Sequence, residues 1–305
     1  MKLFCVKALG FAGMFCLVLI TACFCLPDRF ATQTMLVAQR DKCEMVRTID
    51  SPRVILVGGS GIGLGVNSAA LAEKLCRNVY NAGLHAGLGL IYQMKSVTPL
   101  IKDGDVVVLF PEYSNFDNKT AYGNQELVAV LMDILPEHRK FVSMKQWFAL
   151  TTFILEYGAG KIRRLFSVRL KKNDWTRFDA NGDGVWTLAD PAARCPIPLS
   201  SYWKADHYSP MVLPYIAAFK REVNLKHGRL IIMPPAVQSA FYDRQTEFVD
   251  RIAYACREAG LPFAVPTKRY ALPDEWFYDT PYHLNLLGRN RRAEMLAEDL
   301  SGLMK

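Results

Sequence analysis

The stretch "RVILVGGSGIGLG" (residues 53–65) decides the fold of this chain. A short run rich in β-branched residues ends at paired glycines, which favours a buried strand followed by a sharp turn that carries Ser60. Far along the chain, "FYDTPYHLNLLGR" (residues 277–289) puts Asp279 and His283 just before a C-terminal helix. Serine becomes a good nucleophile when a base takes its proton and an acid orients the base. The two segments together predict a Ser–His–Asp site.

Between these segments, short apolar runs alternate with helical patterns. Strands are predicted at 53–57, 105–110, 229–233 and 263–265, with another beginning near residue 78, and helices at 67–77, 90–100, 245–259 and 286–304. This alternation is typical of an α/β protein in which helices cover both faces of a parallel sheet, a three-layer α/β/α sandwich. The carboxyl ends of such strands line the ligand crevice. Four predicted strands are followed directly by Gly59–Ser60, Gly87, Glu112–Tyr113 and Pro234–Pro235.

The N-terminal residues 1–27 are predicted to direct export. Lys2 and Lys7 form a basic start, and the segment from Ala8 to Pro27 carries no charge. Residues 20–23 resemble a bacterial lipobox with Cys23 as the lipidated residue, while the apolar length also fits an uncleaved anchor; free secretion is a third alternative. Each alternative places the rest of the chain outside the cytoplasm. We expect residues 28–50 to be a linker and 51–305 to be one domain with an insertion at about 136–224, within which 191–214 is loop.

Net charge and cysteine content limit which partners and which disulfides the sequence allows. The formal net charge is +8, and six basic residues cluster at Lys161, Arg163, Arg164, Arg169, Lys171 and Lys172. In an exported protein such a cluster favours anionic lipid or an anionic envelope polymer over nucleic acid, although a solvated helix face gives the same pattern. Four domain cysteines, Cys43, Cys76, Cys195 and Cys256, allow three disulfide pairings, or they are buried free thiols.

With these motifs in view, the domain resembles the SGNH/GDSL hydrolase superfamily, in particular its membrane-tethered bacterial members. The block "GGSGIGLG" resembles the family's nucleophile turn, which implies that Ser60 is the nucleophile. The block "NAGLHAGLG" implies an oxyanion-hole N–H at Gly87, and the last block implies Asp279 as acid and His283 as base. Two positions depart from the family pattern. "DTPYH" has three residues between acid and base where two are usual, and Glu112 stands where the family has an oxyanion Asn, with Asn115 three residues later.

The resemblance implies acyl transfer from an ester, with no cofactor required. The expected function is an extracytoplasmic esterase or O-acyltransferase that acts on an acylated envelope glycan or a small ester. An ionised Glu112 cannot donate to an oxyanion. The alternative is therefore a catalytically inactive SGNH-like protein that binds such a polymer or scaffolds a membrane acyltransferase.

Two other motifs point elsewhere. The glycines of "GGSGIGLG", Asn81 to Gly83, Ser143, and the pair Tyr157 and Lys161 together mimic a short-chain dehydrogenase, but Asn81 follows the glycines too closely for that fold. The segment "DANGDGVWTLAD" has the spacing of a calcium loop. The expected ligands are Asp179, Asn181, Asp183, Val185 and Asp190, and a turn without metal is the alternative.

Overall fold

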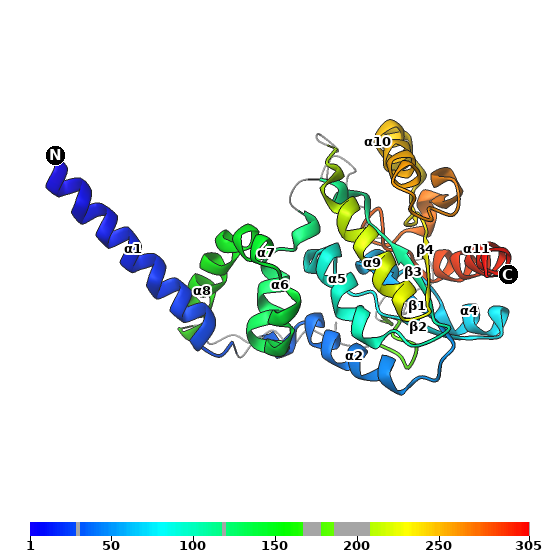
Figure 1. The fold of residues 1–305 in the computed structure, drawn as a ribbon, viewed down its shortest axis with the longest axis horizontal. Helices are drawn as coiled ribbons and strands as arrows, with labels where there is room; N and C mark the ends of the chain where they lie inside the picture. The colour runs from blue at the N-terminus through cyan, green and yellow to red at the C-terminus, as the bar shows by residue number, and fades with distance from the viewer. Residues whose placement is uncertain (29–30, 118–119, 167–177, 186–207, 305) are drawn as a thin grey trace.

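A four-stranded parallel sheet forms the centre of the computed structural model, which describes residues 1–28, 31–117, 120–166, 178–185 and 208–304. The strand order is β2-β1-β3-β4, so β1 and β3 are the inner strands and the chain crosses from β2 past β1 to reach β3 (Figure 1). The parallel register pairs Ile55 with both Tyr80 and Val107. The predicted parallel sheet is thereby confirmed. The strands are β1 (Arg53–Gly58), β2 (Asn78–Asn81), β3 (Val106–Phe110) and β4 (Arg229–Ile232).

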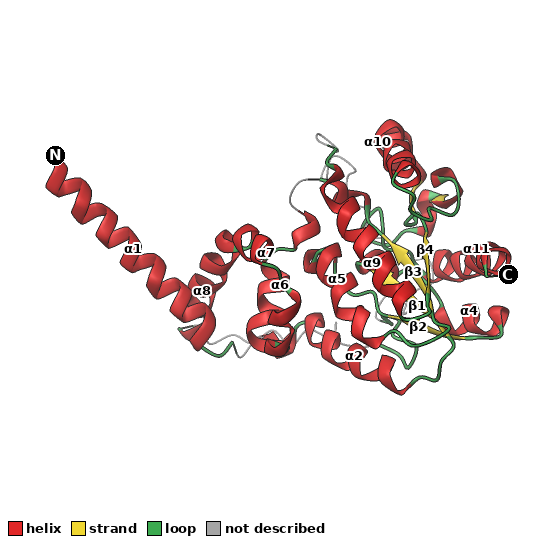
Figure 2. Cartoon of the chain, in the orientation of Figure 1, coloured by secondary structure: helices red, strands yellow, loops and turns green. Residues whose placement is uncertain are grey.

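Helices pack on both faces of this sheet, because alternate strand residues point to opposite sides. Ile55 and Val57 join one apolar cluster with α2, α5, α9 and α10, while Val54 and Leu56 join another with α4 and α11. Figure 2 shows how much of the chain is helical around the short yellow strands. The helices that cover the sheet are α2 (Ala38–Thr48), α4 (Ser68–Leu75), α5 (Leu90–Val97), α9 (Leu213–Leu225), α10 (Ser239–Glu258) and α11 (Leu286–Leu303).

Residues 28–50 differ from the expected linker because they contain α2, which packs against the domain. Its Lys42 is 2% exposed and donates from Nζ to the carbonyl oxygens of Asn81, Gly83 and Gly182. A polar helix sequence with one buried lysine carries too few apolar residues to be recognised as core from periodicity alone. The segment is therefore part of the folded unit.

The expected boundaries differ at three further places. The end of the expected insertion is α9, which lies between β3 and β4 as a regular crossover helix and begins before the predicted loop ends. Pro214 did not prevent this helix, because proline is well tolerated in a first helical turn. The expected strand 263–265 is reduced to a single parallel bridge between Phe263 and Ile232. Helix α10 begins at Ser239, before the expected residue 245.

A helical extension lies between the sheet domain and the N-terminal helix (Figure 1). It contains α6 (Gln125–Ala129), α7 (Met144–Ala149) and α8 (Thr151–Leu165). The N-terminal helix α1 (Lys2–Cys25) is long and apolar enough to cross a membrane, or to serve as a signal sequence. Only its last turns are covered, by α8: Leu19, Ala22 and Cys23 are buried. At Gly158 of α8 an added Cβ would overlap the Leu19 carbonyl oxygen, so the two backbones touch.

A buried polar cluster holds the end of α1. Lys161 of α8 donates from Nζ to the carbonyl oxygens of Cys23 at 2.7 Å and Leu26 at 2.6 Å, and pairs with Asp133. The Tyr157 hydroxyl donates to Asp133 at 2.7 Å. A cation at a helix C-terminus satisfies carbonyls that have no partner within the helix. Tyr157 and Lys161, two residues of the dehydrogenase-like motif, therefore fix a helix end and do not face the glycine-rich turn.

The basic cluster is not one solvated face. Lys161 and Arg164 are engaged in ion pairs with Asp133 and Asp28, while Arg163 is exposed. Arg169, Lys171 and Lys172 lie outside the described residues.

Candidate functional site

The structure brings Ser60, His283 and Asp279 together at the carboxyl end of β1. The Nε2 atom of His283 lies 2.8 Å from Ser60 Oγ, and its Nδ1 atom lies 2.7 Å from Asp279 Oδ1. Ser60 opens the short helix α3 (Ser60–Gly63) directly after β1, as the glycine-rich turn predicts. The imidazole therefore bridges a hydroxyl and a carboxylate across a separation of 223 residues. In this geometry a histidine base can remove the proton of a serine hydroxyl while a carboxylate holds the imidazole in the right orientation.

A local turn explains why three residues separate Asp279 from His283. The Oγ1 atom of Thr280 accepts the N–H groups of both Tyr282 and His283, at 3.2 and 3.0 Å. The N–H of Tyr278 donates to the His283 carbonyl at 2.8 Å and closes the loop. Threonine hydroxyls stabilise such turns through this kind of local bond. The longer spacing is thus compatible with acid and base side chains that meet on one side of the turn.

Two arginines of α11 hold the turn that carries Ser60 in place, and the sequence motifs did not predict either of them. Arg292 is fully buried and donates from Nη1 to the carbonyl oxygens of Gly61 at 2.7 Å and Gly65 at 3.1 Å. Arg289 donates to the Val66 carbonyl at 3.0 Å. Burial lowers the pKa of Arg292 to about 10, which leaves it charged at neutral pH. Since α11 starts just after His283, the same helix fixes both halves of the triad.

Glu112, which stands at the position of the expected oxyanion Asn, lies behind the turn that carries Ser60. Its Oε1 accepts the Gly61 N–H at 3.3 Å, and the residue is 7% exposed. Burial raises the pKa of the Glu112 carboxyl, although the Gly61 N–H and the His283 ring act in the opposite direction. A carboxyl group that stays protonated is a hydrogen-bond donor. The objection that Glu112 cannot donate therefore applies only to its ionised form.

The other two oxyanion candidates are placed differently. The N–H of Gly87 donates to Nδ1 of His85 at 3.0 Å, so it is occupied in this conformation. Asn115 is buried, and among the described residues no hydrogen bond joins it to Ser60 or His283. His85 was missed by the sequence analysis, although it is the one titratable residue inside "NAGLHAGLG". Burial lowers the pKa of His85; the Glu126 carboxylate opposes this shift, and the neighbouring His283 adds to it.

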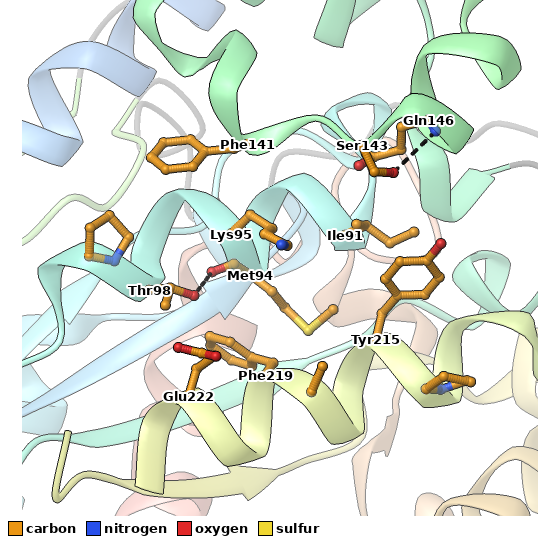
Figure 3. Close-up of a pocket in the computed structure, with 13 residues that line it drawn as sticks. Ile91, Met94, Lys95, Thr98, Phe141, Ser143, Gln146, Tyr215, Phe219 and Glu222 are labelled. Carbon is orange, nitrogen blue, oxygen red and sulfur yellow. Dashed lines mark hydrogen bonds between the residues drawn. The ribbon is translucent and has the colours of Figure 1, made fainter. Parts of the chain in front are cut away.

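Two concave regions lie near α7. One, with a volume of about 620 Å³, extends from Ala86 and Gly87 to Phe153 on α8. The other, about 630 Å³, lies between α5 and α9 and contains no residue of the triad (Figure 3). Lys95, Phe219 and Glu222 are among the residues that line this second region. The described residues that line the first region include Gly87, the expected oxyanion residue, but not Ser60, His283 or Asp279.

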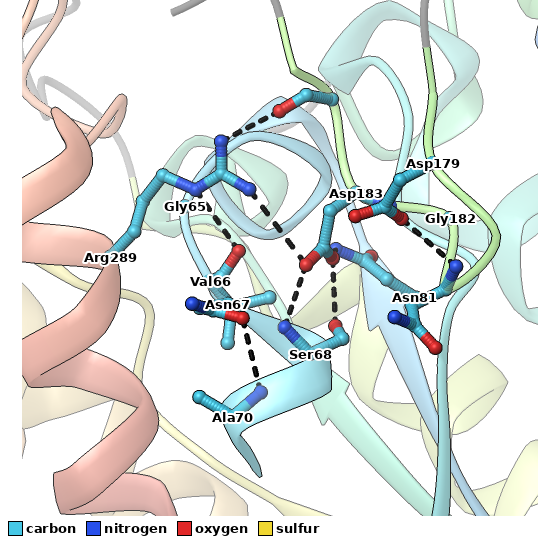
Figure 4. A network of polar contacts seen from close by, with 12 residues as sticks. Gly65, Val66, Asn67, Ser68, Ala70, Asn81, Asp179, Gly182, Asp183 and Arg289 are labelled. Carbon is cyan, nitrogen blue, oxygen red and sulfur yellow. Dashed lines mark hydrogen bonds and ion pairs between the residues drawn. The ribbon is translucent and has the colours of Figure 1, made fainter. Parts of the chain in front are cut away.

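The expected calcium loop is used for internal bonds (Figure 4). The Asp183 carboxylate accepts the Ser68 N–H at 2.6 Å and the Asn81 amide at 2.8 Å, and lies 3.7 Å from Arg289. Asp179 accepts the N–H groups of Asn181 and Asp183 within its own turn. In the described ranges no group of three His, Cys, Asp or Glu side chains could hold a metal ion. Val185 is described but Asp190 is not, so the calcium site stays a prediction.

The described domain cysteines are not paired with one another. Cys43 and Cys256 are buried and Cys76 is exposed, each as a free thiol. Cys195 lies outside the described residues.

Comparisons with known proteins do not name this site. No family model matches the chain. No curated protein matches it either.

Proposed function

We propose that this protein is a serine-dependent acyl-transfer enzyme of the SGNH type, an esterase or O-acyltransferase that acts on an ester of a cell-envelope glycan. The observation that carries the proposal is the chain of two short contacts from Ser60 through His283 to Asp279. In the same proposal the sheet and its two helical faces make a three-layer α/β/α domain. The strand order and the helix cover on both faces support it.

The proposed reaction follows the geometry. Ser60 Oγ forms a bond to the ester carbonyl carbon while its proton passes to His283 Nε2. The tetrahedral oxyanion is stabilised by the N–H of Ser60 and by hydrogen-bond donors nearby. The intermediate then breaks the bond to the alcohol oxygen, which takes the proton from His283. Water or a sugar hydroxyl attacks the acyl-serine, and His283 again removes and returns the proton.

We also propose that α1 remains as an uncleaved anchor with the domain outside the cytoplasm. Cys23 is fully buried against α8, and its carbonyl oxygen accepts Lys161, which supports a retained helix over a lipidated and cleaved one. Lys2 and Lys7 at the start of α1 favour a cytoplasmic N-terminus. A membrane acyltransferase partner fits this location and is part of the proposal.

The second candidate is an inactive binding or scaffolding protein. Two observations favour it: the Gly87 N–H is occupied by His85, and Glu112 replaces the family's Asn. The two candidates differ in whether Ser60 is reactive.

Labelling with a short fluorophosphonate tests this difference. Full-length protein in detergent should lose fluoride from the probe and form a Ser60 phosphonate, and Ser60→Ala and His283→Ala should both abolish the label. Ser239→Ala serves as a control, since Ser239 lies at the start of α10 and bonds Asp274. Absence of labelling in folded wild-type protein would overturn the enzyme proposal in favour of the second candidate.

A further inference from the structure

We propose that the groove between Gly87 and α8 holds the acyl chain of the ester, and that this chain enters from the lipid bilayer beside α1. The inference rests on the proposed reaction at Ser60 and adds to it the substrate class: an ester whose acyl chain is long and membrane-borne. It concerns the concave region of about 620 Å³ described above, which we call the acyl groove.

The acyl groove begins at Ala86 and Gly87, beside the turn that carries Ser60. An added Cβ at Gly59 would lie 3.1 Å from the Cα atom of Ala86, so the groove's first residue packs against the turn that presents Ser60. From Gly87 the groove continues to Ala149 at the end of α7 and to Thr152 on α8. Its volume falls within the range of about 300–1,000 Å³ that is typical of small-molecule sites. A chain attached to the reacting carbonyl would therefore extend toward α7 and α8.

The walls of the acyl groove suit an uncharged, apolar ligand. Ala86, Gly123 and Ala149 leave space, and the rings of Tyr122 and Phe153 supply apolar surface. The polar lining consists of hydroxyl and amide groups, and no charged side chain is found among the described residues that line it. An anionic polymer would require cationic partners there. A hydrocarbon chain gains free energy in such a groove in proportion to the apolar area it buries.

Phe153, at the far end of the acyl groove, packs against the apolar cluster that also contains Cys23 of α1. The ring of Trp147 on α7 is 6.4 Å from that of Phe24 on α1, and α8 packs along the last turns of α1. Around this junction Phe148 is 76% exposed and Phe166 84% exposed. Met144 and Leu165 are exposed as well, and Lys145 and Arg163 stand beside them.

A bilayer surface is the partner that fits this junction. Exposed aromatic side chains with neighbouring cations are typical of helices at the lipid–water boundary. The patch is also continuous with α1, a helix long and apolar enough to cross a membrane. A bilayer around α1 would therefore cover Phe148 and Phe166 and bring acyl chains to the open end of the groove.

Two probes of the same nucleophile test the acyl groove. The full-length protein in lipid nanodiscs is labelled with fluorophosphonates that carry an ethyl or a dodecyl chain. Ten additional methylene groups should raise the rate for the dodecyl probe about tenfold or more. Thr152→Trp narrows the groove and should return the ratio of the two rates to near one, whereas Thr151→Trp, on the adjacent exposed position outside the groove, should leave the ratio unchanged.

The outcomes separate the two proposals. If neither probe labels Ser60, the proposed reaction fails. If both probes label at equal rates, or if Thr152→Trp and Thr151→Trp change the ratio alike, the reaction stands and the acyl groove is overturned.

A photo-crosslinker tests the entry from the bilayer. Benzophenone placed at Phe148 should cross-link to lipid in nanodiscs, and the same group at Tyr254, which is 63% exposed on α10, should not. Equal lipid cross-linking at the two positions, or none at Phe148, would overturn the membrane entry.

Discussion

Arg292 on the C-terminal helix donates a hydrogen bond of 2.7 Å to the carbonyl oxygen of Gly61, the residue that follows the candidate nucleophile. The bond connects the helix that follows His283 to the turn that carries Ser60. We therefore expect Arg292→Met to misplace the serine and to slow fluorophosphonate labelling by about 10- to 100-fold, because small errors in alignment are costly. When the labelling rate is measured over a range of probe concentrations, the rate constant for bond formation should fall, while the affinity for the probe should change little.

Arg291 provides the matched control for this variant. Its side chain is 48% exposed and pairs with Glu294 at the surface. Arg291→Met should change the labelling rate by less than about twofold, since exposed ion pairs contribute little. Equal labelling by Arg292→Met and wild type, with both folded, would show that Arg292 does not position Ser60.

Glu112 should make the stability of the domain depend on pH. Burial raises its pKa in the folded protein above the ordinary value of 4.5. Between the unfolded and folded pKa values the folded state holds the proton more tightly, so the free energy of unfolding falls as pH rises through this window and is then constant. Glu112→Gln, which has no proton to lose, should remove this decline. Urea denaturation of both proteins from pH 4.5 upward measures the difference, and parallel pH profiles would contradict a neutral Glu112.

Gly158 should be required for the contact between α1 and α8. An added Cβ there would overlap the Leu19 carbonyl oxygen, whereas one at Gly160 would meet only the flexible end of Arg164 at 3.0 Å. We expect Gly158→Ala to destabilise this junction by about 1–3 kcal/mol through overpacking. Gly160→Ala should be neutral or stabilising by up to about 1 kcal/mol, as helix propensity predicts. Limited proteolysis of the α1–α8 junction in detergent compares the two.

Asp183 should matter for stability without calcium. Its carboxylate accepts bonds from Ser68 and Asn81 and lies beside Arg289, so Asp183→Ala leaves a buried cation without its partner. Loss of one member of a buried pair costs about 3–5 kcal/mol. The melting temperature should therefore drop equally in a chelator and in calcium. A calcium-dependent rise in the wild-type melting temperature that Asp183→Ala abolishes would instead support the metal loop.

The sequence was sufficient to predict the strands near Ser60 and the pairing of Asp279 with His283. These features follow from local patterns: β-branched runs next to glycines, and an acid and a base in one short turn. The roles of Lys42, Arg289 and Arg292 could not be predicted, because each depends on which carbonyl groups a distant segment leaves without partners. A lone lysine or arginine in a helix has the same local pattern whether it is buried or solvated.

The contacts at the end of α1 also could not be predicted from the sequence. Tyr157 and Lys161 match a spacing that occurs in dehydrogenases, but their partners are Asp133 and the last carbonyls of α1. Spacing along one helix places two side chains on the same face, and it carries no information on what that face contacts. The role of Gly158 could not be predicted either, because a side chain is excluded there by the backbone of α1, which is distant in sequence.

The distance of 223 residues between Ser60 and His283 also has a consequence for the timing of assembly. A chain synthesised from its N-terminus releases the serine turn first, and its base follows 223 residues later, together with the arginines of α11. Until then the serine hydroxyl is an ordinary alcohol. It gains its base only when the segment with His283 packs beside the serine turn, so a product truncated before residue 283 carries the serine and lacks the base that would activate it.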